Sequence, residues 1–125
     1  MKKILIIDDE RGFTEMVKLN LEATGLFTVQ IENIPTRALD TVLECQPDLI
    51  LLDIIMPELE GPDIVYLIRN NERVSHIPIV FLTATITREE VVERSGTVGG
   101  HVFLAKPCSI NELIEVIEQQ TAKKS

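Results

Sequence analysis

Residues 3–10 read Lys-Ile-Leu-Ile-Ile-Asp-Asp-Glu, a short apolar run that stops abruptly in three acids. An apolar run of this length, rich in isoleucine and leucine, is typical of a strand that is buried on both faces. Four more such runs follow along the chain, at residues 27–31, 49–52, 77–82 and 102–105. The sequence therefore predicts five buried strands.

Segments with helical periodicity separate these runs. Apolar residues recur three or four positions apart within residues 13–21, 38–43, 64–68 and 110–117. Ser109 and Glu112 form a capping-box pattern at the start of the last segment. Residues 89–94 give the weakest helical pattern because their apolar stripe is thin, and residues 95–100 have the composition of a glycine-containing loop.

The alternation of strand and helix predicts an α/β fold, a five-stranded parallel sheet with helices on both faces. Crossover connections are right-handed, so covering both faces requires the chain to reverse its direction across the sheet once. For five units the common strand order is 2-1-3-4-5, with a cleft at the carboxyl ends of strands one and three. We expect a single domain over residues 1–121, and a tail or truncated linker over residues 122–125.

Composition excludes several classes of protein. The chain has 125 residues, with 20 acidic against 12 basic residues and a formal charge of −8. This charge argues against direct binding of nucleic acid, which needs a basic surface, and against docking on an anionic membrane. Cys45 and Cys108 have no metal-ligand spacing, so a reducing cytoplasm is the expected location.

Polar residues stand where four of the expected strands end. They are Asp8, Asp9 and Glu10 after strand one, Asp53 after strand three, Thr83 after strand four and Lys106 after strand five. Each alone has an ordinary explanation, because Asp and Thr often cap the next helix and Lys is usually solvated. The expected topology brings all of them to one edge of the sheet, and capping needs neither the second acid nor the lysine. The joint arrangement therefore favours a functional site.

Crowded carboxylates require positive charge nearby. Two carboxylates about 4 Å apart repel by about 4 kcal/mol at an effective dielectric constant of about 20. The oxygen ligands of Asp8, Asp9 and Asp53 suit Mg²⁺. A divalent cation, the ammonium of Lys106 and a hydroxyl that faces a carboxylate together hold a phosphoryl group well. Asp53 is then the candidate nucleophile, and the product would be an aspartyl phosphate.

The set of residues resembles that of the receiver domain of two-component response regulators, which has a flavodoxin-like fold. The motif comprises Asp8-Asp9, Asp53 with Met56-Pro57 and Gly61, Thr83-Ala84 and Lys106-Pro107, and the resemblance covers essentially the whole chain. It implies that Asp53 accepts a phosphoryl group from a histidine kinase or a histidine phosphotransfer protein. It also implies a Mg²⁺ site made by Asp9, by Asp8 directly or through water, by Asp53 and by the backbone carbonyl of Ile55.

The resemblance further implies a switch. Thr83 and Lys106 would hold the phosphoryl oxygens, and Phe103 occupies the place of the family's switch aromatic. Phosphorylation is expected to draw the Thr83 hydroxyl inward and to turn Phe103 from an exposed to a buried position. The face made by helix four, strand five and helix five would then change its affinity for a downstream protein or output domain. The sequence is compatible with a homodimer through this face but does not require one.

Ile55 argues against turnover of external substrates. Phosphatases of the haloacid dehalogenase type place a second Asp two residues after the nucleophile as general acid and base, and here Ile55 has that position. We therefore expect that the chain is not an enzyme. We expect a signalling phosphoacceptor that catalyses only its own phosphorylation and slow dephosphorylation. The alternative is a receiver-like module that binds its partners without phosphate. The intact acids, hydroxyl and lysine argue against it.

Overall fold

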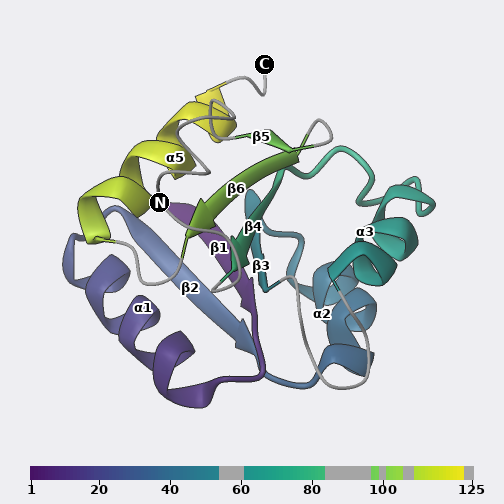
Figure 1. Ribbon diagram of the computed structural model, residues 1–125, viewed down its shortest axis with the longest axis horizontal. Coiled ribbons are helices and arrows are strands. Elements are labelled where there is room, and N and C mark those ends of the chain that lie inside the picture. The colour runs from purple at the N-terminus through teal and green to yellow at the C-terminus, as the bar shows by residue number, and fades with distance from the viewer. Residues whose placement is uncertain (54–60, 84–96, 99–100, 106–108, 123–125) are drawn as a thin grey trace.

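A parallel sheet forms the centre of the computed structural model (Figure 1), which describes residues 1–53, 61–83, 97–98, 101–105 and 109–122. Its parallel strands lie in the order β2-β1-β3-β4-β6, so the predicted order of five parallel strands is confirmed. The bounds are Lys2–Ile7 for β1, Phe27–Glu32 for β2, Leu49–Asp53 for β3, Ile79–Thr83 for β4 and His101–Ala105 for β6.

One strand was not predicted from the sequence. β5 (Thr97–Val98) pairs antiparallel with β6 at the edge of the sheet, where we expected part of a glycine-containing loop. Two residues are too few to show a hydrophobic period, so this strand depends on the neighbouring backbone of β6 rather than on a pattern of its own.

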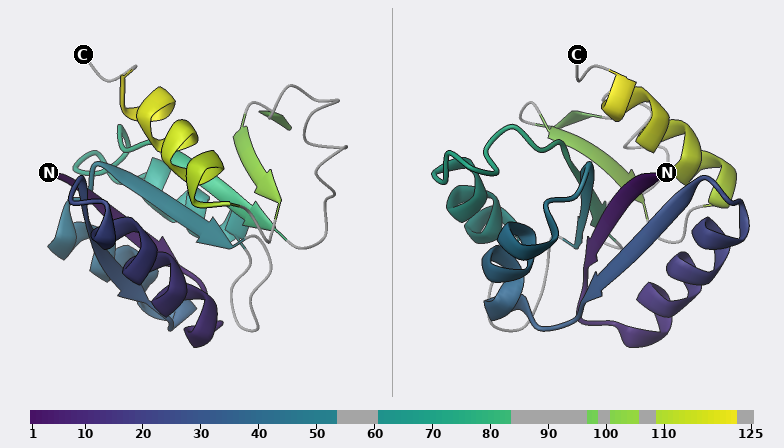
Figure 2. Two further views of the ribbon diagram at one scale, coloured as in Figure 1. Left: turned by 90° about the vertical axis from the view of Figure 1, so that its left-hand side faces the viewer. Right: turned by 180° about the vertical axis from the view of Figure 1, so that it is seen from behind.

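Helices cover both faces of the sheet, as predicted (Figures 1 and 2). α1 (Arg11–Ala23) and α5 (Ile110–Ala122) lie on one face. The short helix η1 (Pro35–Arg37), α2 (Ala38–Cys45) and α3 (Gly61–Arg69) lie on the other. The helix expected over residues 89–94 falls outside the described residues. Within the ranges given above, no helix is long and apolar enough to span a membrane.

The core follows from the alternation of side chains along each strand. In β1, Ile4 and Ile6 pack toward α1 and α5, whereas Leu5 and Ile7 pack toward α2 and α3. All four are fully buried, because helices cover the strand from both sides. Burying an aliphatic side chain of this size contributes about 1.5–3 kcal/mol, so the four side chains of β1 stabilise the fold from both faces of the sheet.

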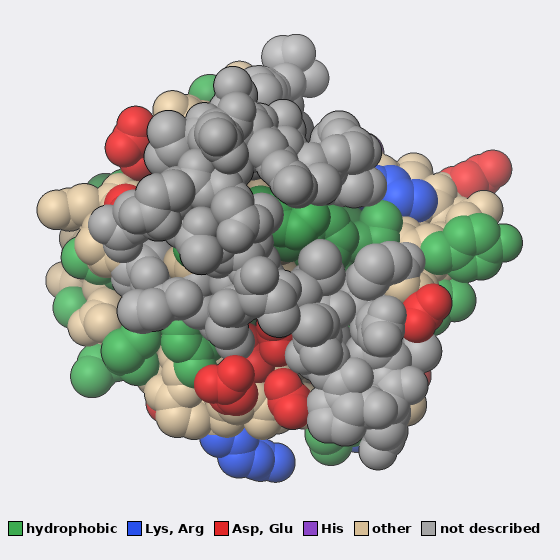
Figure 3. Space-filling view, viewed as in Figure 1, with side chains coloured by type: hydrophobic (Ala, Val, Ile, Leu, Met, Phe, Trp, Pro, Cys, Tyr) green, Lys and Arg blue, Asp and Glu red, His purple; other side chains and the backbone are tan. Residues whose placement is uncertain are grey.

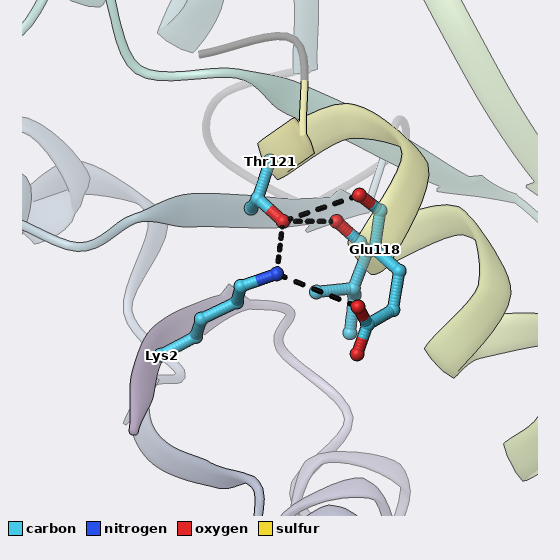
Figure 4. A network of polar contacts seen from close by, with 4 residues as sticks. Lys2, Glu118 and Thr121 are labelled. Carbon is cyan, nitrogen blue, oxygen red and sulfur yellow. Dashed lines mark hydrogen bonds and ion pairs between the residues drawn. The ribbon is translucent and has the colours of Figure 1, made fainter. Parts of the chain in front are cut away.

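Side-chain contacts fix both ends of α5. At its start, the Glu112 amide donates to Ser109 Oγ over 3.1 Å and the Ser109 amide donates to Glu112 Oε1 over 3.3 Å, which confirms the predicted capping box. At its end, Lys2 Nζ donates to Thr121 Oγ1 over 2.7 Å and lies 3.6 Å from the carboxylate of Glu118 (Figure 4). α5 extends to Ala122, one residue past the expected end of the domain.

Polar contacts also stabilise the amino edge of the sheet. Arg69 Nη1 donates to the carbonyls of Ser75 and Ile77, both over 2.8 Å, and this contact holds the connection from α3 to β4. Burial lowers the pKa of the Arg69 guanidinium. At the end of α2, Lys3 Nζ donates to the carbonyl of Cys45, and burial raises the pKa of the Cys45 thiol. These contacts lie at the edge opposite to the acids described next.

Candidate functional site

The acids that follow β1 and end β3 lie side by side at the carboxyl edge of the sheet. The parallel register pairs Ile7 with Leu52. Asp8 is the residue after Ile7, and Asp53 is the residue after Leu52. Asp8 is fully buried and Asp53 is 6% exposed. The topology therefore places two carboxylates in a part of the molecule where uncompensated negative charge is costly.

A third carboxylate completes this cluster, which we call the acid trio. Asp8, Glu10 and Asp53 each present a carboxylate oxygen, and these oxygens all lie within 4.8 Å of one another. Acidic side chains gather on the surface where β1 and β2 end (Figure 3). Three hard oxygen donors at this spacing match the ligand preference of Mg²⁺, which usually takes a few carboxylates and keeps several waters. The residues present therefore fit a magnesium ion.

Local hydrogen bonds shape the loop that carries two members of the trio. The amide of Asp8 donates to the carbonyl of Glu32 over 3.1 Å and so extends the pairing of β1 with β2. The amide of Glu10 donates to Asp8 Oδ1 over 3.0 Å, which turns the chain sharply after the strand. Glu10 then serves as the residue before α1, with an extended backbone at φ −83° and ψ 97°.

The trio differs from the predicted ligand set at one position. We expected Asp9 beside Asp8 and Asp53, whereas the carboxylate that the structure brings to this pair is that of Glu10, which is exposed like Asp9. The predicted role of Asp9 stays a prediction. The turn closed by the bond from the Glu10 amide to Asp8 Oδ1 brings Glu10 back beside Asp8. The sequence shows Glu10 among the acids after strand one, but its place beside Asp8 depends on this turn.

The remaining predicted site residues are described only in part. Thr83 is the last residue of β4 and pairs in register with Ala105, so its backbone lies at the same edge as the trio. The side chain of Thr83 falls outside the described part of the structure, as do the whole of Ile55 and Lys106. Their predicted roles therefore stay predictions.

Phe103 differs from the expected exposed starting position. The residue is 8% exposed, and its ring stacks on that of Phe81, with ring centroids 5.0 Å apart and an interplanar angle of 25°. The register explains the contact, because Phe81 and Phe103 are directly paired neighbours on β4 and β6. A stacked aromatic pair gains about 0.5–1.5 kcal/mol beyond burial, which favours the buried position in the described structure.

Comparison with known proteins assigns this chain to a family. The family described as the response regulator receiver domain matches residues 4–118. The chain belongs to this family. The match covers β1 from Ile4 onward, all the other described strands and both acids that the register brings together, so the resemblance stated from the motif is confirmed for the receiver domain as a whole.

Receiver domains from several bacteria are similar to this chain. The DNA-binding dual master transcriptional regulator RpaA of Synechocystis is 33% identical over 115 residues, which are 91% of this chain and 46% of RpaA. The polar-differentiation response regulator DivK of Brucella anthropi is 31% identical over 117 residues, which are 94% of each chain. The chain therefore spans less than half the length of RpaA but nearly all of DivK.

The fold agrees with that of solved receiver domains. The receiver domain of the Francisella response regulator 1452 superposes with a TM-score of 0.80 at 25% identity, over 100% of both chains. The agreement extends over the whole chain.

Proposed function

We propose that this receiver domain, residues 1–121, accepts a phosphoryl group on Asp53 from a histidine kinase or a histidine phosphotransfer protein, in a reaction that depends on Mg²⁺. The observation that carries the proposal is the acid trio, in which the buried Asp53 lies within 4.8 Å of two other carboxylates. Such a cluster is tolerable when a cation neutralises it, and the same cation neutralises the charge of an incoming phosphoryl group. The family match supports this reading.

Asp53 supplies the nucleophile in this proposal. One carboxylate oxygen forms a bond to phosphorus while the bond from phosphorus to the donor's imidazole nitrogen breaks, and the imidazole leaves with the electron pair of that bond. Asp53 ends β3 at the centre of the sheet, so its carboxylate is held by a rigid element rather than by a long loop.

Asp8 and Glu10 would hold the magnesium ion together with Asp53, since these are the oxygens that the structure brings together. The resemblance adds Asp9 and the carbonyl of Ile55 as further proposed ligands. When bound, the ion supplies positive charge that stabilises the transferring group. Thr83 and Lys106 are the proposed contacts of the phosphoryl oxygens.

The proposed output is a change in partner binding at the face made by β6, α5 and the helix expected over residues 89–94 (helix four). Thr83 and Phe103 form the proposed switch pair. They lie on the neighbouring strands β4 and β6, where Thr83 pairs with Ala105 and Phe103 pairs with Phe81. The buried ring of Phe103 lies in the core shared with α2 and α3, so a shift at β4 reaches it through its contact with Phe81. We propose that this face binds a downstream protein or an output domain. A homodimer could form through the same face.

The proposal is tested by incubating the chain with acetyl phosphate and Mg²⁺ and recording the intact mass. We expect the mass of one phosphoryl group to be added, and we expect EDTA to prevent the addition. On the same sample, nuclear magnetic resonance of a ring-labelled Phe103 should show a shift upon phosphorylation. A chain that gains no mass with Mg²⁺ present would contradict the phosphoacceptor function, and an unchanged Phe103 signal in a phosphorylated chain would remove Phe103 from the switch.

A further inference from the structure

Asn33, directly after β2, contacts the loop that carries two members of the acid trio. Its side-chain amide Nδ2 donates to the backbone carbonyl of Asp8 over 2.8 Å and to Thr14 Oγ1 over 3.0 Å. An amide nitrogen has two hydrogens, so these two bonds use its full donor capacity. Asn33 therefore ties the end of β1 to the first turns of α1 from a third segment of the chain.

The contacts close into a ring, which we call the Asn33 ring, made of Asp8, Glu10, Thr14 and Asn33. The Glu10 amide donates to Asp8 Oδ1 over 3.0 Å, and the Thr14 amide donates to the Glu10 carbonyl over 3.1 Å. Thr14 Oγ1 accepts from Asn33 and donates to the carbonyl of Arg11 over 3.0 Å. Two of the three carboxylates of the trio thus belong to residues of one hydrogen-bonded ring.

The ring opposes a force that the trio itself creates. Carboxylates this close repel one another, so without a cation the loop that carries Asp8 and Glu10 is pushed away from Asp53. Thr14 is fully buried and Asn33 is half-buried, so the bond between the Asn33 amide and the Thr14 hydroxyl is partly shielded from water. Removal of the Asn33 amide leaves the Asp8 amide bonded to the Glu32 carbonyl, so the pairing of β1 with β2 persists while the loop is released.

We propose that Asn33 is a positioning residue for magnesium binding: its amide holds Asp8 and Glu10 in the arrangement that binds the ion together with Asp53. This inference rests on the proposed function, in which Mg²⁺ is the cation of the trio. Asn33 touches neither the ion nor the phosphoryl group in this account. It acts through its hydrogen bonds to the Asp8 carbonyl and to Thr14. Hydrogen bonds of this kind, made to a ligand residue and not to the metal, orient metal ligands.

The test is calorimetric titration of Mg²⁺ into the full chain and into Asn33→Ala. Losing an outer contact of this kind typically weakens metal binding 10-fold or more, so we expect the Mg²⁺ Kd of the variant to rise about 10-fold. Asn70→Ala is the matched control. Asn70 lies directly after α3, far from the trio in sequence, and its Nδ2 also donates to a backbone carbonyl, that of Tyr66, over 2.7 Å. We expect its Kd to stay within about twofold of the parent chain.

A readout in the metal-free chain separates positioning from general destabilisation. Amide hydrogen exchange at Glu10 and Thr14 should become faster in Asn33→Ala, while exchange in the central strand β3 stays unchanged. A purely structural role would speed exchange in β3 as well. That result, or a Kd of Asn33→Ala within about twofold of the parent, would overturn the positioning role.

Two further variants keep the inference testable if Asn33→Ala does not fold. Asn33→Leu retains a branched side chain of similar shape without its donors, and we expect the same weaker binding. Thr14→Val removes one partner of Asn33 but leaves the bond to the Asp8 carbonyl, so its Kd should rise less. If the parent chain itself binds no Mg²⁺, the proposed function fails together with this inference. If the parent binds and all the Asn33 and Thr14 variants bind equally well, only this inference fails.

Discussion

Replacement of Asp53 by asparagine is expected to abolish phosphorylation by acetyl phosphate and, at the same time, to stabilise the metal-free chain. The amide oxygen is a poor nucleophile, and no carboxylate remains at the end of β3 to form the bond to phosphorus. The variant also removes one buried negative charge next to Asp8 and Glu10. We expect the free energy of unfolding in EDTA to rise by about 1–2 kcal/mol, because the repulsion within the trio is relieved.

The two halves of this prediction are measured by intact mass and by thermal unfolding in EDTA. A gain of this size raises Tm by about 5 °C in a chain of this length. Asp40→Asn is the matched control, since Asp40 is an exposed acid on α2 and outside the trio. The control should accept the phosphoryl group like the parent and show an unchanged Tm. A phosphorylated Asp53→Asn chain would mean that another residue is the acceptor.

Magnesium is expected to stabilise the chain strongly. A ligand that binds only the folded state adds about 2.7 kcal/mol to the free energy of unfolding when its concentration is about 100 times Kd. For this chain we expect Tm to rise by about 10 °C between EDTA and saturating Mg²⁺. The effect should be largely lost in Asp8→Asn, because that variant removes one carboxylate of the trio.

Salt must be excluded as the cause of this shift. The chain carries a formal charge of −8, so any electrolyte reduces its self-repulsion. The comparison is therefore made against NaCl at equal ionic strength, which should reproduce only a small part of the rise. Equal Tm values in Mg²⁺ and NaCl would contradict a magnesium site at the trio.

Most of the fold could be predicted from the sequence, because buried apolar runs and segments with helical periodicity recur along the chain. The apolar runs that became β1 and β3 are buried on both faces, and only a sheet covered by helices on both sides provides that environment. The capping box at Ser109 fixed the start of α5 at the right residue. The antiparallel strand β5 could not be predicted, because two residues carry no period and their partner is decided by tertiary structure.

The site could be predicted where it depends on the sheet, but not where it depends on the loop. Strand order and register bring Asp8 next to Asp53, and both follow from topology alone. The place of Glu10 beside this pair depends on a single turn, in which the Glu10 amide donates to Asp8 Oδ1. Asn33 was not identified from the sequence at all, because an asparagine after a strand is common in turns and its partners lie 25 and 19 positions away.

The most direct test of the central claim is to locate the phosphoryl group. An acyl phosphate is reduced by borohydride to an alcohol, which marks the acceptor carboxyl permanently and survives digestion. After reaction with acetyl phosphate and Mg²⁺, reduction and peptide sequencing by tandem mass spectrometry, we expect the mark on the peptide that carries the end of β3, at Asp53. A mark at Asp8, Asp9 or Glu10, or no mark in a chain that has gained the phosphoryl mass, would contradict the account.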